Sequence, residues 1–193
     1  VNFWSYYYNY SVKIYDSDEI INYVTELNVN NNLTDTNIKR LLRWKDAKML
    51  TEIILSGPNR GILNDRVARV LDNLSFINDF RNNNIEPENF LHITNEIFPN
   101  GLIWSVFLFH IAKPLFYPIA DQHVFRSYSI LTGANTPIDF SQYLLYKDFF
   151  ISIASASNNF QEGNEVNNTN IANLKKVDNA LFIYGKFLKR FRR

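Results

Sequence analysis

The run from Leu102 to Ala112 constrains the fold most, because it is apolar on almost every side of a helix. A helix on a protein surface keeps one polar face, whereas a helix that is apolar all round is surrounded by other elements. Ser105 and His110 interrupt the run, which is well short of the roughly 20 residues that a membrane-spanning helix needs. We therefore expect a buried central helix, ended by Pro114, in a protein built from helices.

Apolar residues recur at helical spacing along the rest of the chain, with start and stop signals between the segments. Asn64 and Asp121 are side chains that cap helices, and Pro87 suits a first helical turn. Together these signals predict helices over about 17–27, 34–46, 48–55, 64–81, 87–97, 102–112, 121–132, 137–156 and 170–193.

The alternating pattern of a strand is absent, except in Tyr6 to Tyr15, for which a strand, a helix and an extended arm all remain open. A chain of 193 residues can bury its own core without disulfide or metal support. We expect a single compact all-α domain over 1–193, with about eight or nine helices. It would comprise an aromatic N-terminal arm (1–15), a central hairpin and Asp-bearing helix (98–133), and a C-terminal helix with a basic end (170–193).

Composition excludes several kinds of chemistry. The chain has no Cys, so disulfides, thiolate metal sites, iron–sulfur clusters and cysteine nucleophiles are excluded. His92, His110 and His123 lack the spacing of a metal site, and we expect neither a metal nor another cofactor.

The net charge of +1 is too small for a protein that coats nucleic acid by bulk charge. Positive charge is instead concentrated at the C-terminus, where it either contacts phosphates or forms a solvated helix end. The basic residues of this tail are Lys186, Lys189, Arg190, Arg192 and Arg193.

The N-terminal segment lacks the basic start and apolar core of a secretory signal. We expect a monomeric, cytoplasmic protein without a membrane partner. Because the sequence begins with Val1 rather than Met, we also expect the natural chain to begin upstream.

Two segments resemble a known superfamily. The first, Phe98-Pro99-Asn100-Gly101 and the helix after it, precedes the second, Tyr117-Pro118-Ile119-Ala120-Asp121-Gln122-His123-Val124-Phe125-Arg126. They resemble the core of the helix-hairpin-helix DNA glycosylases, where a Gly-bearing hairpin joins two helices and a Pro-containing loop leads to an Asp-x-His-Val-x-Arg helix start. The segments Arg43-Trp44-Lys45-Asp46 and 177–186 are similar to landmarks of uncharacterised bacterial proteins related to 8-oxoguanine glycosylases.

The resemblance implies a helix-hairpin-helix-like core, DNA as a partner, and a role for each matching residue. Asp121 takes the position of the catalytic aspartate, which would stabilise positive charge on a sugar as its base departs. Asn100, Gly101, His123 and Arg126 are the candidate DNA contacts, and the aromatic rings of Trp104 and Tyr117 are candidate walls of a pocket in which an extruded base stacks.

The chain departs from the family where strand-cleaving glycosylases carry a Schiff-base lysine, because Leu102 to Val106 contains no Lys. The resemblance therefore implies monofunctional hydrolysis of a base–sugar bond. The hairpin also has one glycine, Gly101, where a fuller phosphate-binding hairpin has a second nearby.

Each candidate also has a purely structural interpretation. Asp121 is a suitable N-cap, His123 and Arg126 can serve in packing and in an internal ion pair, and Trp104 and Tyr117 can be core aromatics. The alternative function is a non-catalytic helical module, derived from the same fold, that binds nucleic acid or protein.

Overall fold

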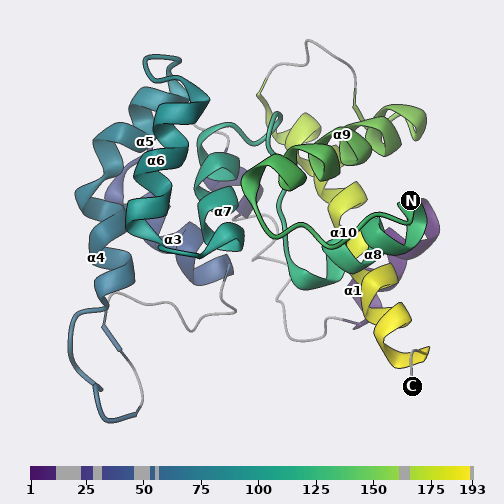
Figure 1. Cartoon of the computed structure of the whole chain (residues 1–193), viewed down its shortest axis with the longest axis horizontal. Coiled ribbons are helices and arrows are strands. Elements are labelled where there is room, and N and C mark those ends of the chain that lie inside the picture. Colours follow the sequence, from purple (N-terminus) through teal and green to yellow (C-terminus); the bar gives the residue numbers. More distant parts are fainter. Residues whose placement is uncertain (12–22, 28–31, 46–52, 55–56, 161–165, 192–193) are drawn as a thin grey trace. The chain divides into compact units, whose positions relative to one another are not determined.

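The computed structural model describes residues 1–11, 23–27, 32–45, 53–54, 57–160 and 166–191 (Figure 1). These ranges are almost entirely helical, and the β pairing within them is limited to one antiparallel bridge between Ile53 and Leu63. The all-α prediction is confirmed. The helices are α1 (Asn2–Ser11), α3 (Asp35–Lys45), α4 (Asp65–Asp72), α5 (Leu74–Arg81), α6 (Pro87–Ile97), α7 (Leu102–Ala112), α8 (Gln122–Thr132), α9 (Phe140–Ala156) and α10 (Asn168–Phe191).

The chain divides into two compact units. Unit 1 contains Val1–Asp16 and Lys113–Arg193, so both ends of the chain belong to it, and unit 2 is the continuous stretch Ser17–Ala112. The boundary follows Ala112, which means that the segment 98–133 contributes its hairpin turn to unit 2 and its Asp-bearing helix to unit 1.

Unit 2 is built around α7, whose residues from Ser105 to Ala112 are all buried. Its aromatic centre brings together Phe80 of α5, Phe90 of α6 and Phe109 of α7. The ring centroids of Phe80 and Phe90 are 4.2 Å apart, and Phe109 meets the same two rings edge-on at 5.1 and 4.8 Å. The predicted buried central helix is therefore confirmed.

The side chain of Arg81 caps the C-terminal end of α7. Arg81 Nη1 donates to the backbone oxygens of Ile111 at 3.2 Å and Ala112 at 3.1 Å, and its Nη2 donates to the oxygen of Leu27 at 3.3 Å. The last carbonyls of a helix have no partner within the helix and carry partial negative charge. Arg81 satisfies both needs at once, although burial lowers the pKa of its guanidinium.

Unit 1 consists of α1, α8, α9 and α10, with α1 packed along α10 (Figure 1). The ring centroids of Trp4 on α1 and Tyr184 on α10 are 5.3 Å apart. Of the three possibilities left open for the Tyr-rich start, the helix is found over Asn2–Ser11, while residues 12–15 lie outside the described ranges.

Several predicted helix ends are confirmed because their signals are local. Asn64 and Asp121 accept backbone hydrogen bonds as N-caps of α4 and α8, as predicted, whereas α9 begins at Phe140 rather than 137 and is capped by Asp139. Gly133 ends α8 in a left-handed conformation with φ 75°, and Pro87 opens α6.

Two predicted helices differ from the structure. The helix expected over 64–81 is broken at Asn73, whose side-chain amide donates to the backbone oxygen of Arg69 at 2.9 Å and separates α4 from α5. The helix expected over 48–55 is wrong at residues 53 and 54, because Ile54 pairs with Ile62 (N to O, 2.9 Å) instead of continuing a helix. The remainder of that prediction, 48–52, and residues 17–22 of another lie outside the described ranges.

No helix in the described part of the chain combines the length and the apolar character needed to cross a membrane.

Candidate functional site

The loop before α8 places Asp121, and two tyrosines of α9 fix that loop. The hydroxyl of Tyr143 donates to the backbone oxygen of Pro118 at 2.9 Å, and the hydroxyl of Tyr146 donates to that of Ile119 at 3.1 Å. Both tyrosines are fully buried, so these carbonyls have their partners inside the protein rather than in water. Asp121 follows directly and therefore starts from a restrained backbone.

The electrostatic surroundings keep both hydroxyls protonated. Burial raises the pKa of Tyr143 well above its ordinary value, with a further contribution from Tyr117. Burial also raises the pKa of Tyr146, and the charges of Asp178 and Asp121 add to the effect. Tyr146 thus lies within electrostatic reach of two carboxylates and remains a hydrogen-bond donor at neutral pH.

Asp121 caps α8. Its Oδ1 accepts from the backbone N–H of His123 at 2.6 Å and of Val124 at 2.9 Å, and its backbone is extended, with φ −151° and ψ 175°. Asp121 as a residue is half-buried, so it is not fully enclosed within unit 1. The capping interpretation is confirmed, and the aspartate is also held in one orientation at the positive end of a helix.

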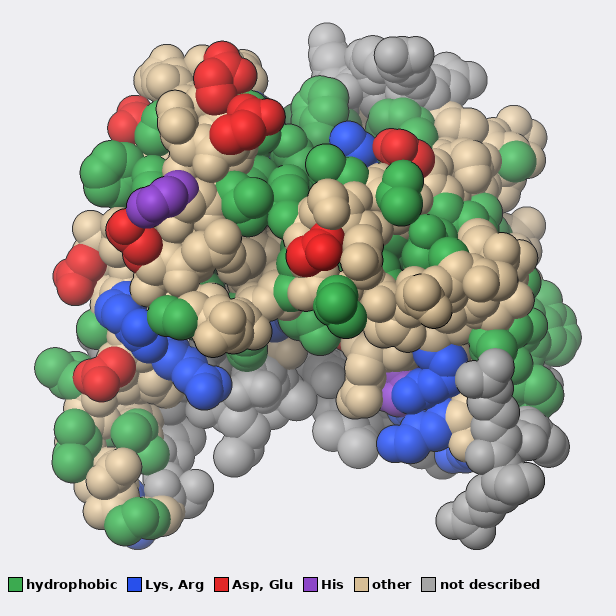
Figure 2. Space-filling model, in the orientation of Figure 1, with side chains coloured by type: hydrophobic (Ala, Val, Ile, Leu, Met, Phe, Trp, Pro, Cys, Tyr) green, Lys and Arg blue, Asp and Glu red, His purple; other side chains and the backbone are tan. Residues whose placement is uncertain are grey.

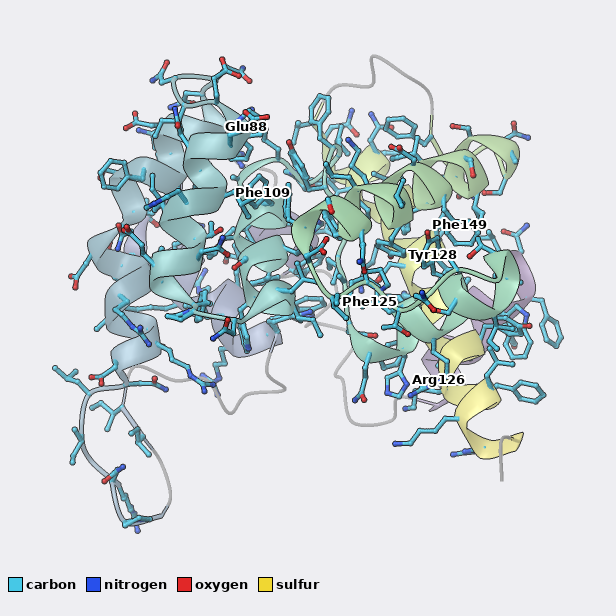
Figure 3. The ribbon with its side chains drawn as sticks, viewed as in Figure 1. Glu88, Phe109, Phe125, Arg126, Tyr128 and Phe149 are labelled. Atoms are coloured by element: carbon cyan, nitrogen blue, oxygen red, sulfur yellow. The ribbon has the colours of Figure 1, made fainter. Side chains whose placement is uncertain are left out.

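His123 and Arg126 lie one turn apart on α8 and contact each other. Arg126 Nη1 is 2.9 Å from His123 Nδ1, and it also donates to the backbone oxygen of Gly185 on α10 at 3.1 Å. Because a guanidinium only donates, Nδ1 of His123 serves as the acceptor and the ring is neutral in this arrangement. Figure 3 shows Arg126 directed toward α10, while Phe125 and Tyr128 extend toward α9.

The pKa of His123 is consistent with a neutral ring. Partial burial lowers it most; the carboxylate of Asp121 raises it, and the charges of Arg126, Lys186 and Lys189 lower it. The pKa of the imidazole therefore depends on one carboxylate and three cations of unit 1.

Gly185 allows α8 and α10 to cross at close range. A Cβ at this position would overlap the backbone oxygen of His123 and would lie 2.9 Å from Ser127 Oγ, which is closer than side-chain atoms approach. Ser127 Oγ also donates to the backbone oxygen of Leu181 at 2.6 Å. The crossing brings Lys186, the next residue on α10, to the side of α8 that carries His123.

Arg126, Lys186 and Lys189, gathered about His123, form what we call the basic cluster. Lys186 Nζ lies 5.2 Å from the ring centroid of Phe182, and the ring of His123 meets the same phenyl ring edge-on at 5.1 Å. Figure 2 shows Lys and Arg side chains beside a histidine on this face of unit 1. Cations grouped in this way favour an anion such as a phosphate.

The predicted hairpin residues lie in unit 2. Asn100 adopts the left-handed conformation with φ 59°, in the turn that joins α6 to α7. The N–H of Gly101 donates to the oxygen of Phe98 at 2.9 Å, and the oxygen of Gly101 accepts from Trp104 at 2.8 Å. The Gly101 amide is thus committed to the turn itself, which removes one of the donors that a phosphate would need.

The two predicted wall residues, Trp104 and Tyr117, make aromatic or cation contacts within their own units. Trp104 stacks on Phe98 at 5.5 Å in unit 2. Tyr117 is buried in unit 1, and Lys147 Nζ lies 5.5 Å from its ring centroid. Unit 1 therefore brings Asp121, His123 and Arg126 together, and the role of both aromatics as pocket walls stays a prediction.

A buried ion pair on α10 was missed by sequence reasoning. Lys175 and Asp178 pair three residues apart with both side chains buried, and the neighbouring Asn179 has a buried Oδ1 without a hydrogen-bond partner. The i,i+3 spacing of opposite charges was a readable signal, but the sequence did not show that the pair would be enclosed.

Among the residues that the structure describes, no three His, Asp or Glu side chains are grouped as metal ligands. No family model, curated protein or solved structure matches this chain.

Proposed function

We propose that the chain binds DNA through unit 1 and hydrolyses a base–sugar bond with Asp121 as its catalytic residue. The observation that carries this proposal is the carboxylate of Asp121, a half-buried residue at the start of α8, near the basic cluster on the same helix and on α10. A carboxylate near the sugar and a surface that holds phosphates are two of the components that base excision requires.

Each component has a distinct task. The basic cluster would hold backbone phosphates while a nucleotide rotates out of the stack. The carboxylate would then stabilise the positive charge that develops on the sugar, and it would orient a water for attack. Asp121 suits this task because its Oδ1 is fixed by two amides, so the side chain needs little reorganisation as charge develops.

The start of α7 supports hydrolysis over covalent catalysis. Residues Leu102 to Val106 contain no lysine, so the amine that would form a Schiff base with the sugar is missing from that helix start. Excision should therefore leave an abasic site with an intact strand.

The test is an excision assay on duplexes that contain alkylated, oxidised or deaminated bases, followed by alkali to cleave abasic sites. Asp121→Asn keeps a side chain that caps helices but removes the charge, so we expect excision to fall by at least about 100-fold, with the free energy of unfolding nearly unchanged. Asp139→Asn is the matched control, because Asp139 caps α9 through the same kind of Oδ1 hydrogen bond.

Two results would contradict the proposal. If Asp121→Asn excises as fast as the parent, the carboxylate is not catalytic. If borohydride traps a covalent protein–DNA complex, the reaction uses an amine, and the argument from the missing lysine fails.

A non-catalytic nucleic-acid-binding module is the second candidate. It is favoured by the two hydrogen bonds that Oδ1 of Asp121 already accepts, because a cap alone accounts for them. Duplex binding that weakens steeply with salt, without excision of any lesion, would select this candidate.

A further inference from the structure

Three large aromatic side chains of unit 1 are exposed on neighbouring helices. Phe3 and Tyr6 of α1 are 63% and 60% exposed, and Phe187 of α10 is 42% exposed. Aromatic residues are usually buried, so several together at the surface need an explanation. We call Phe3, Tyr6 and Phe187 the aromatic face.

Trp4 links two of the three side chains, one on each helix. Its ring centroid lies 5.3 Å from that of Phe187 and 5.3 Å from that of Phe3. Phe3 and Tyr6 are three residues apart, which places them on the same side of α1. The aromatic face therefore contains residues of both α1 and α10, two helices that pack along each other (Figure 1).

The aromatic face continues into positive charge along α10. Successive residues of a helix are about 100° apart, so Arg190, three positions after Phe187, lies on nearly the same side. Lys186 and Lys189 lie further round the helix, where their charges reach His123. Around the last turns of α10, Phe187 is thus followed first by Arg190 and then by the two lysines of the basic cluster.

We propose that this surface binds an unpaired segment of nucleic acid, with bases stacked on the aromatic face and phosphates held by Arg190, Lys186 and Lys189. The inference rests on the proposed binding of nucleic acid by unit 1 and specifies which form is bound. In a duplex the flat faces of the bases are hidden by their neighbours, whereas a single strand offers them to aromatic side chains. Aromatic rings beside cations provide partners for both the bases and the phosphates of a single strand.

The test compares a labelled oligothymidylate of about 20 nucleotides with its duplex by fluorescence anisotropy at fixed salt. Phe187→Ala, and Phe3→Ala combined with Tyr6→Ala, should each weaken single-strand binding by about tenfold and change duplex binding by less than about twofold. Phe76→Ala is the matched control, since Phe76 on α5 of unit 2 is 43% exposed and should leave both affinities unchanged.

Phe187→Leu separates stacking from folding. Leucine keeps an apolar contact with Trp4 but has no aromatic ring, so we expect the same loss of single-strand affinity, with an unchanged unfolding transition. Lys189→Glu should weaken single-strand and duplex binding alike and reduce their dependence on salt.

Unchanged oligothymidylate binding by the three aromatic variants would overturn the inference. The inference would also be overturned if the aromatic variants lost affinity only for vesicles containing phosphatidylserine. That result would identify the aromatic face as a membrane-contacting surface. Neither result bears on Asp121, because excision is measured separately on duplexes. Conversely, an inactive protein whose aromatic variants lose single-strand affinity would reject catalysis and keep the present inference.

Discussion

Gly185 shows how one missing side chain determines the geometry of the candidate site. Because an added methyl group would overlap the backbone oxygen of His123, Gly185→Ala would force α8 and α10 apart. We expect it to lower the free energy of unfolding by about 1–3 kcal/mol and to disturb the basic cluster. Urea denaturation measures the first effect, and oligonucleotide binding measures the second.

Gly101→Ala provides the comparison within the same chain. A Cβ at Gly101 would meet Phe98 Cβ at 3.1 Å, a contact that a small shift relieves. Its cost should be clearly smaller than that of Gly185→Ala. Equal costs would mean that the close crossing of α8 and α10 is not what requires a glycine.

His123 should make the stability of unit 1 depend on pH. Because its pKa lies below the ordinary value of 6.5, the unfolded chain takes up a proton in a range where the folded chain does not. The free energy of unfolding should therefore fall as pH drops below about 6.5, and the loss should stop once the folded pKa is passed. Urea denaturation at several pH values should show that His123→Gln is less sensitive over this range than the parent. A steeper fall for the variant would contradict the predicted direction.

The elements that sequence reasoning placed well are those whose signals lie within a few residues. The caps Asn64 and Asp121 and the terminator Gly133 act through local hydrogen bonds and local φ preference. The same holds for α7, whose uniform apolar character predicts burial without reference to any partner.

The helix that was predicted wrongly and the site residue that was missed both depend on contacts between residues far apart in the sequence. Ile53 follows a helical pattern in sequence but bridges to Leu63 across a turn. Asp121, His123 and Arg126 were singled out as candidates because the Asp-x-His-Val-x-Arg pattern is local, whereas the approach of Lys186 depends on the crossing at Gly185, which no local pattern specifies.

The aromatic packing of α7 should dominate the stability of unit 2. Phe109 is fully buried against Phe80 and Phe90, so Phe109→Ala removes contacts on both sides and leaves a cavity. We expect a loss of about 3–5 kcal/mol in the free energy of unfolding, measured by urea denaturation. Phe76→Ala, on an exposed site of α5, should cost far less. A loss below about 1 kcal/mol for Phe109→Ala would show that α7 is not the centre of this core.

The division into two units predicts that damage in one is confined to it. Trp4 packs against Tyr184 and Phe187 within unit 1, so Trp4→Ala should speed amide hydrogen exchange in α8 and α10. Exchange in α5, α6 and α7 of unit 2 should stay near the parent rate, because those helices have their own aromatic centre. Uniformly faster exchange throughout the chain would instead indicate a single cooperative structure.

The packing of α1 on α10 has a consequence for the order in which a ribosome delivers the chain. Residues 17–112 can assemble as soon as they have emerged, whereas α1 is translated before them and its partner α10 after them. Helix α1 therefore waits, with its aromatic side chains uncovered, until the chain has been translated as far as α10. That interval is when this polypeptide is most exposed to aggregation, and when a chaperone that binds apolar segments would protect it.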